Sequence, residues 1–213
     1  MNRTDVINAL IVKNNYKSYL EIGLDNPNNN YNNIKCDLKE CVDPFIIDHH
    51  KNGFDVNVTE EFLKSIETIL TYRMTSDDFF EQNNKTYDIV FIDGMHTKEQ
   101  VSKDIINSLK VLNTGGKIVV HDCLPAFEEA QIVPRNQAYW NGDVWKTIPE
   151  LKKQNIKYNT VNTDEGICII DFMENKQDLK YVESWEFEWK DFEKNKSELM
   201  NVVSEDDFRN IYL

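Results

Sequence analysis

The chain has 213 residues and a formal net charge of −13, from 24 basic and 37 acidic side chains. Hydrophobic residues make up 40% of it and aromatic residues 11%, which indicates one folded domain with a sizeable core. The acidic surplus repels phosphate backbones and anionic membrane surfaces, so neither nucleic acid nor a membrane is expected as a partner. No apolar run reaches membrane-spanning length, no signal peptide is recognisable and the four cysteines are scattered, so we expect a cytoplasmic protein with reduced thiols.

The first half of the chain predicts two helices and three strands. Apolar residues recur at helical spacing from Val6 to Ile11, which predicts the first helix. Short apolar runs predict strands at Tyr19–Gly23 and at Glu40–Phe45. A helix over Phe62–Leu70 and a third strand near Thr71–Thr75 follow.

The second half predicts the same alternation. Tyr87–Asp93 is a continuous apolar run, typical of a strand that is buried on both faces. Thr97–Gln100 is a capping box that opens a helix ending at Gly115–Gly116, with another buried strand at Lys117–Val120. The remaining predicted elements are a helix over Val144–Lys153 and an antiparallel pair of strands at Lys157–Val161 and Gly166–Phe172. Together they predict an α/β fold whose mostly parallel sheet is covered on both faces.

Nearly every predicted strand ends in a carboxylate or an imidazole side chain. Ligands of an open parallel sheet bind beyond the carboxyl ends of its strands, so these residues form one candidate site. Each of them also has an ordinary interpretation as a turn, cap or core residue, and the prediction depends on their shared position. In chain order they are Glu21 and Gly23, Asp43, Ser76, Asp77 and Asp78, Asp93 and His96, and His121 and Asp122.

The spacing of the acids indicates the ligand. Asp43 follows the first strand by about 20 residues, the offset at which an acid accepts hydrogen bonds from ribose hydroxyls. The Asn-rich loop after Gly23 lacks the three glycines of a pyrophosphate site, and Glu21 and Asp25 would repel phosphate. S-adenosyl-L-methionine fits better than NAD, because it combines a ribose with two cationic groups and one carboxylate. The asparagines are expected to supply turn conformations and local hydrogen bonds.

Five segments in this order resemble the class I S-adenosylmethionine-dependent methyltransferases: YLEIGLDNP, CVDP, TSDDFF, YDIVFIDGMH and LNTGGKIVVHDCLP. The most similar branch is the small O-methyltransferase-like one whose strands end in Asp-Gly-x-His and His-Asp. The resemblance implies a Rossmann-like three-layer α/β/α sandwich around a mostly parallel seven-stranded sheet with an antiparallel last strand. Residues 1–175 would be the methyltransferase domain, and residues 176–213 a C-terminal extension packed on it.

The resemblance also implies which residues bind the cofactor and the acceptor. Residues Leu124–Trp140 would form an acceptor-side insertion, in which Arg135, Tyr139 and Trp140 could stack on or clamp a sugar or an aromatic ring. The implied cofactor-binding residues are Glu21 and Gly23 at the methionine and ribose side, Asp43 at the ribose hydroxyls, Ser76 and Asp77 at the adenine, and Asp93 beneath the transferring methyl group.

Two mechanisms remain open, because transfer to a hydroxyl needs alignment and removal of a proton. In the first, His121 or His96 is the general base and Asp122 or Asp93 orients its ring. In the second, Asp93, His121 and Asp122 hold Mg²⁺ or a similar cation, which lowers the pKa of the hydroxyl. The base is favoured, since an imidazole is a poor ligand for a hard cation. A second His–Asp cluster, at residues 48–50, is interpreted as a solvated loop.

The predicted function is therefore S-adenosylmethionine-dependent O-methylation of a small-molecule or sugar hydroxyl. A non-catalytic cofactor-binding module and an NAD-dependent oxidoreductase are the alternatives. Trp185–Trp189 alternates apolar and acidic residues, which predicts an extended segment with one buried face. This segment could cover the sheet or form a homodimer contact.

Overall fold

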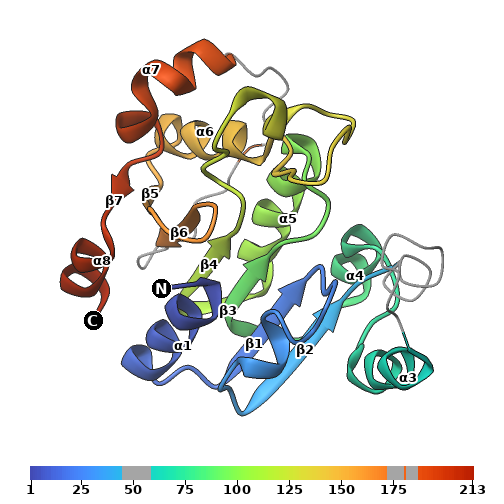
Figure 1. Ribbon diagram of the computed structural model, residues 1–213. Coiled ribbons are helices and arrows are strands. Elements are labelled where there is room, and N and C mark those ends of the chain that lie inside the picture. The colour runs from blue at the N-terminus through green and yellow to red at the C-terminus, as the bar shows by residue number, and fades with distance from the viewer. Residues whose placement is uncertain (45–58, 172–179, 181–186) are drawn as a thin grey trace.

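The computed structural model describes residues 1–44, 59–171, 180 and 187–213. It has a central sheet with helices on both faces (Figure 1). Within these residues the strands lie in the order β2-β1-β3-β4-β6-β5-β7. β6 runs antiparallel to both of its neighbours, and the other pairs are parallel. The expected mostly parallel seven-stranded sheet is confirmed. The strands are β1 (Ser18–Ile22), β2 (Leu38–Val42), β3 (Tyr87–Ile92), β4 (Leu112–Val120), β5 (Lys157–Val161), β6 (Ile167–Asp171) and β7 (Val202–Val203).

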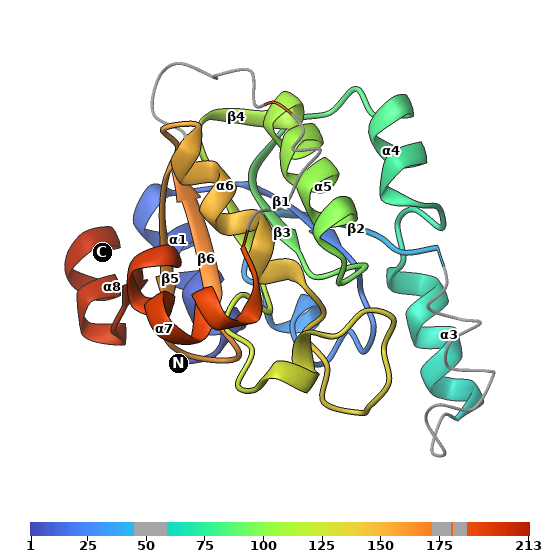
Figure 2. The same cartoon turned by 90° about the horizontal axis from the view of Figure 1, so that it is seen from above.

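The described helices form the two outer layers (Figure 2). Buried residues of α1, α3 and α8 belong to the core on one face of the sheet, and those of α4, α5, α6 and α7 to the core on the other. No helix among the described residues is long and apolar enough to cross a membrane. The helices are α1 (Arg3–Asn14), α3 (Glu60–Ile69), α4 (Ser76–Gln82), α5 (Lys98–Val111), α6 (Thr147–Lys153), α7 (Trp189–Leu199) and α8 (Glu205–Tyr212).

Burial on both faces of the sheet explains why the central strands are mostly apolar. Successive residues of a strand point to opposite faces of the sheet. In β3, Val90 and Ile92 therefore join the core under α5, whereas Ile89 and Phe91 join the core under α1. All four side chains are fully or almost fully buried. A strand with a core on each face has no solvent-facing position left for polar residues, which explains why the polar side chains appear at its end.

The predicted strand near Thr71–Thr75 is wrong. Only Tyr72 pairs with β2, through a single parallel bridge to Val42. Thr75 is already the N-cap of α4, because its side chain accepts a hydrogen bond from the Asp78 amide. The chain between α3 and α4 therefore makes one isolated bridge and no strand. The seventh strand is β7 instead, which pairs in parallel with β5.

The boundary between α5 and β4 also differs from the prediction. The helix ends at Val111, and the strand includes both Gly115 and Gly116. A Cβ atom at Gly116 would lie 2.6 Å from the carbonyl oxygen of Asp88 in β3. The two glycines therefore do not cap the helix; Gly116 lets the irregular start of β4 pass close to β3.

The C-terminal residues 187–213 build onto the same sheet. Beyond β7, they contribute Phe192 to the core under α5 and Phe208 to the core under α1. The predicted extended segment ends at Glu188, because Trp189 is the first residue of α7. The segment's first two residues, and the Asp-His-His cluster at 48–50, lie outside the described residues.

Candidate active site

The carboxyl ends of the parallel strands β1 to β4 open into one cavity of about 790 Å³. Predicted cofactor-side residues on its wall are Gly23, Asp43, Ser76 and Asp77. The parallel topology predicts this convergence, since successive strands deliver their last residues to the same edge.

Gly23 lets two of these strand ends approach each other closely. Its φ of +87° lies in the left-handed region. A Cβ atom there would lie only 2.2 Å from the carbonyl oxygen of Asp93. No other residue fits this position, so the glycine is required by contact between the β1 and β3 loops.

The asparagines that follow hold the β1 loop by local hydrogen bonds, as expected. The Asn26 side chain accepts from the Asn28 amide at 3.0 Å. Asn30 lies deeper: its carboxamide oxygen accepts from the Thr4 hydroxyl, and its nitrogen donates to Glu21 at 3.0 Å. The loop is thus built from side-chain hydrogen bonds in place of glycines.

Glu21 supports this loop and does not line the cavity. Its side chain points to the α1 face of the sheet, where the Tyr19 hydroxyl and Asn30 both donate to it. Only 2% of the residue is exposed. Burial, aided by the charge of Asp93, raises its pKa to about 8 against the effect of the two donors. The geometry does not support a direct contact between Glu21 and a cofactor.

Asp43 stands at the cavity wall directly after β2. Its carboxylate accepts a hydrogen bond from the Leu24 amide at 3.0 Å, which ties the β2 end to the β1 loop. This bond fixes the carboxylate at the side of the cavity where the resemblance expects a ribose.

Gln100 and Asp104 join the adenine-side residues, and the sequence analysis missed both. The Gln100 carboxamide lies 3.1 Å from the Ser76 hydroxyl and from a carboxylate oxygen of Asp77 and of Asp104. Burial raises the pKa of Asp104 to about 7. The sequence contains one signal that relates the two residues: residues four apart on α5 lie on the same face of the helix. In the structure this face turns to α4.

The acceptor-side residues Asp93, His96, His121 and Asp122 form one compact cluster. The Nε2 atom of His96 lies 3.3 Å from an oxygen of Asp93 and 3.3 Å from one of Asp122. The Nδ1 atom of His121 lies 3.4 Å and 3.2 Å from the same two oxygens. Asn141 donates to the second oxygen of Asp122 at 2.6 Å.

Electrostatics favours the charged forms of all four. Burial opposes protonation of His121, but the charge of Asp93 and hydrogen bonding to Asp122 raise its pKa well above the ordinary value. Burial likewise opposes protonation of His96, and its contacts with Asp93 and Asp122 raise its pKa. Burial would raise the pKa of Asp93, but His121 and His96 hold it well below the ordinary value. The two carboxylates thus shift both histidines toward protonation, against the effect of burial.

The two histidines differ in their access to the cavity. The His96 side chain is 21% exposed and stacks on Trp140 with ring centroids 5.3 Å apart. The His121 side chain is 1% exposed, so it forms the back of the cluster. A bound acceptor can touch His96 directly.

Arg3 and Asp164 complete the cluster, and the sequence analysis proposed neither as a site residue. The Arg3 guanidinium donates to Asp93 at 2.7 Å and to Asp164 at 2.9 Å. The His121 Nε2 atom lies 3.8 Å from Asp164. The missed signal is topological: α1 leads back into β1, so it begins at the edge where β1 ends, and Asp164 is in the turn after β5.

Four acidic residues at this edge have a left-handed backbone. The φ angles are +42° at Asp25, +61° at Asp122, +45° at Asp164 and +62° at Glu165. Such angles are uncommon for residues other than glycine and cost free energy, so the surrounding hydrogen bonds must hold them.

Residues 21–123 match a family model described as a methyltransferase domain. This stretch is similar to a methyltransferase domain, and the fold is the class I, S-adenosylmethionine-dependent methyltransferase fold. A search of curated protein sequences found no significant match.

Solved structures share the fold of this methyltransferase. A Staphylococcus aureus protein assigned as a caffeoyl-CoA O-methyltransferase is 19% identical, with a TM-score of 0.52, over 79% of this chain and 81% of its own. A Klebsiella pneumoniae protein assigned as an O-methyltransferase is 14% identical, with a TM-score of 0.54, over 82% of each chain. The O-methyltransferase TomG from Streptomyces achromogenes, solved in complex with SAM, is 12% identical, with a TM-score of 0.50, over 79% of each chain.

The acceptor side of the methyltransferase includes the predicted insertion. Arg135, Tyr139 and Trp140 all line the cavity. Arg135 lies over the Trp140 ring, 5.8 Å from its centroid, and donates to two carbonyl oxygens of its own loop. Tyr139 is 40% exposed. Trp140 is stacked on His96, and Tyr139 is stacked on Phe127 with ring centroids 5.4 Å apart.

The residues of this cluster offer ligand atoms for a divalent cation. Asp93, His96 and Asp122 bring one ligand atom each within 4.8 Å of one another, and so do His121, Asp122 and Glu165. The predicted ligands Asp93, His121 and Asp122 all belong to these groups. In addition, both ring nitrogens of His121 are buried without a well-aligned hydrogen bond within the described residues. An imidazole among carboxylates suits manganese, iron or zinc better than magnesium.

Proposed function

We propose that this methyltransferase moves the methyl group of S-adenosyl-L-methionine to a hydroxyl oxygen of a small-molecule or sugar acceptor. One observation carries the proposal: two carboxylates and two imidazoles meet in the cavity wall beyond β3 and β4. A module that only binds a cofactor would not need this cluster. A cofactor with a sulfonium and an ammonium group also suits the acidic wall, and the fold relative TomG binds SAM.

The cofactor would lie along the ends of β1 to β3. Asp43, held by the Leu24 amide, would accept hydrogen bonds from the ribose hydroxyls. Ser76 and Asp77, held by Gln100, would flank the adenine. Asp93 would then lie beneath the sulfonium, with its charge directed at the methyl group.

His96 would act on the acceptor. In the transfer, the bond from the acceptor oxygen to the methyl carbon forms while the sulfur–carbon bond breaks, and the hydroxyl proton passes to the imidazole of His96. The two carboxylates beside its Nε2 atom, each at 3.3 Å, would stabilise the imidazolium that results. His96 is preferred to His121 because its side chain is 21% exposed, whereas the His121 side chain, which also lines the cavity, is 1% exposed.

A bound divalent cation would be held by Asp93, His96 and Asp122. The cation would lower the pKa of the acceptor hydroxyl. Arg3 and Asn141 already hold the outer oxygens of the two carboxylates, so the inner oxygens face the shared position.

The decisive experiment is titration calorimetry with S-adenosylhomocysteine and with NAD. We expect the first to bind and the second not to bind. The Asp43→Ala variant should weaken binding of S-adenosylhomocysteine by about 10- to 100-fold, the scale of hydrogen bonds to a charged group. The exposed Asp37→Ala variant is the control and should bind like the wild type. Comparable or tighter binding of NAD would end the methyltransferase proposal.

A further inference from the structure

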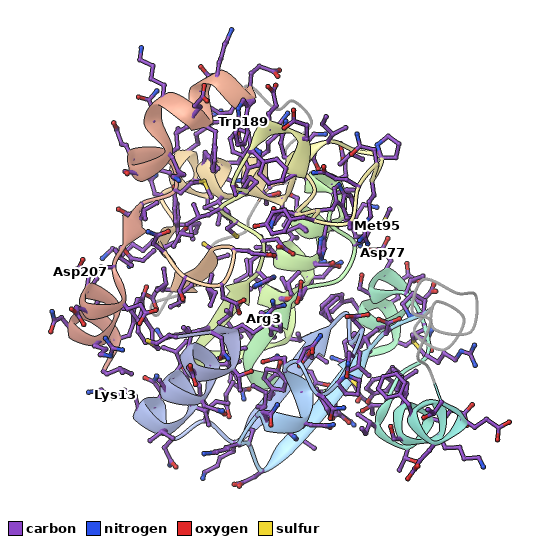
Figure 3. The ribbon with its side chains drawn as sticks, in the orientation of Figure 1. Arg3, Lys13, Asp77, Met95, Trp189 and Asp207 are labelled. Carbon is purple, nitrogen blue, oxygen red and sulfur yellow. The ribbon has the colours of Figure 1, made fainter. Side chains whose placement is uncertain are left out.

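Arg3 brings a permanent positive charge to the cavity from outside the matched segment. It is the first residue of α1, whereas the family match begins at residue 21. Its side chain is 23% exposed and lines the cavity. In Figure 3, Arg3 lies in the middle of the molecule, while Lys13, near the other end of the same helix, lies at the outer edge.

The guanidinium keeps donors that the described part of the chain does not use. Arginine has five N–H groups. The Nε donor and one Nη2 donor go to Asp164, and one Nη1 donor goes to Asp93. One donor on each Nη atom remains without a partner among the described residues. A carboxylate is a preferred partner of guanidinium N–H groups.

The position of Arg3 indicates that the carboxylate it would bind belongs to the cofactor. The methionine end of S-adenosylmethionine would lie beside Gly23 and Asp93, and Arg3 contacts Asp93 directly. The carboxylates of Asp25 and Asp93 on this wall attract the ammonium of the cofactor but repel its carboxylate. The other arginine of the cavity, Arg135, belongs to the acceptor-side loop and donates to its carbonyl oxygens.

We propose that Arg3 binds the carboxylate of the cofactor's methionine group. The inference rests on the proposed function and deepens it, because it explains how an acidic, glycine-poor site holds the one anionic group of S-adenosylmethionine. The ion pairs with Asp93 and Asp164 fix the guanidinium from two sides, so its remaining donors are oriented before the cofactor arrives. Preorganisation of this kind raises affinity by reducing the entropy lost on binding.

The test compares two ligands that differ by one carboxylate. S-adenosyl-3-thiopropylamine is S-adenosylhomocysteine without its carboxylate. By calorimetry, Arg3→Met should weaken binding of S-adenosylhomocysteine by about 10- to 100-fold, the range of charge-assisted hydrogen bonds. The same variant should bind the amine equally well or more tightly, because a positive charge near its ammonium has been removed. Arg3→Lys should lose less affinity for S-adenosylhomocysteine than Arg3→Met.

The matched control is Lys13→Met, which removes a positive charge from the same helix at a distance from the cavity and should change neither affinity. Equal losses for both ligands in Arg3→Met would mean that Arg3 only positions Asp93, and unchanged binding of S-adenosylhomocysteine would remove it from the site. Either result overturns the inference while the proposed function stands. If the wild type binds neither ligand, the proposed function fails and the inference with it. Thermal melting of each variant verifies folding, and Arg3→Lys decides if Arg3→Met does not fold.

Discussion

His96 is the residue on which the two mechanisms can be separated. If His96 is the base, the His96→Ala variant should have a turnover lower by roughly 10²–10⁴-fold. Its affinity for S-adenosylhomocysteine should change little. His121→Ala serves as the comparison, because that ring is buried and would act only through Asp93 and Asp122. Full activity in His96→Ala together with a large loss in His121→Ala would transfer the role of base to His121.

Assays with a chelator complete this test. If His96 alone removes the proton, the wild type keeps its turnover in chelator. If the metal set operates, chelator abolishes turnover and manganese restores it. An unaffected wild type in chelator combined with an active His96→Ala variant would leave transfer by alignment of the two substrates alone.

Gly23 and Gly115 form a matched pair for the close contact between the β1 and β3 loops. Both have a positive φ, of +87° and +79°, but a Cβ atom at Gly115 would meet nothing within 4 Å. Gly115→Ala should therefore cost only the backbone penalty, about 1–2 kcal/mol of unfolding free energy. Gly23→Ala should cost clearly more and abolish binding of S-adenosylhomocysteine, because it pushes the backbone at Asp93 away. Equal losses of stability in chemical denaturation would contradict this reasoning.

At the scale of elements, the buried strands were the most predictable part. Tyr87–Asp93 was recognisable because the strand has a core on both faces and its sequence is mostly apolar accordingly. The prediction of a strand at Thr71–Thr75 failed because one bridging residue, Tyr72, has the same local sequence pattern as a short strand. The prediction that Gly115–Gly116 ends the helix failed because a pair of glycines is typical of an irregular strand as well as of a helix end.

The same distinction explains which site residues could be predicted. A residue that ends a parallel strand is placed by topology, so Asp43, Asp93 and His96 were found at the edge of the sheet. Arg3 and Gln100 come from helices, whose faces toward the cavity depend on packing that a single sequence does not reveal. Glu21 was expected beside the cofactor, but it does not line the cavity, because its side chain points to the α1 face of the sheet.

At the scale of the whole molecule, the two ends of the chain meet beside the site (Figure 1). The amino group of Met1 contacts Glu205 of α8 at 2.5 Å, and the Thr163 hydroxyl donates to the Met1 carbonyl. Thr163 precedes Asp164, the partner of Arg3. The C-terminal segment thus anchors the start of α1, and through it the guanidinium in the cavity.

Glu21 should make the stability of the whole fold depend on pH. Its pKa is raised from 4.5 to about 8, so the folded protein holds it neutral over a range in which the unfolded chain ionises it. Its contribution is fully present below about pH 4.5 and is lost as the pH rises to about 8. The difference in unfolding free energy between Glu21→Gln and the wild type should therefore grow across this window, by at most about 1.4 kcal/mol per pH unit.

Urea denaturation at several pH values measures this difference. The exposed Glu81→Gln variant on α4 is the control and should keep the pH profile of the wild type. A difference between Glu21→Gln and the wild type that stays constant from pH 5 to pH 8 would show that Glu21 is ionised in the folded protein.

The left-handed backbone at Asp122, Asp164 and Glu165 has a consequence for directed evolution of this enzyme. Glycine or asparagine would adopt these angles at a lower cost, so a screen for heat resistance alone should enrich both residues at the three positions. Each such replacement would remove a carboxylate from around His121 or Arg3. Thermostable variants selected in this way would therefore trade turnover for melting temperature, and a screen that retains activity should leave all three positions unchanged.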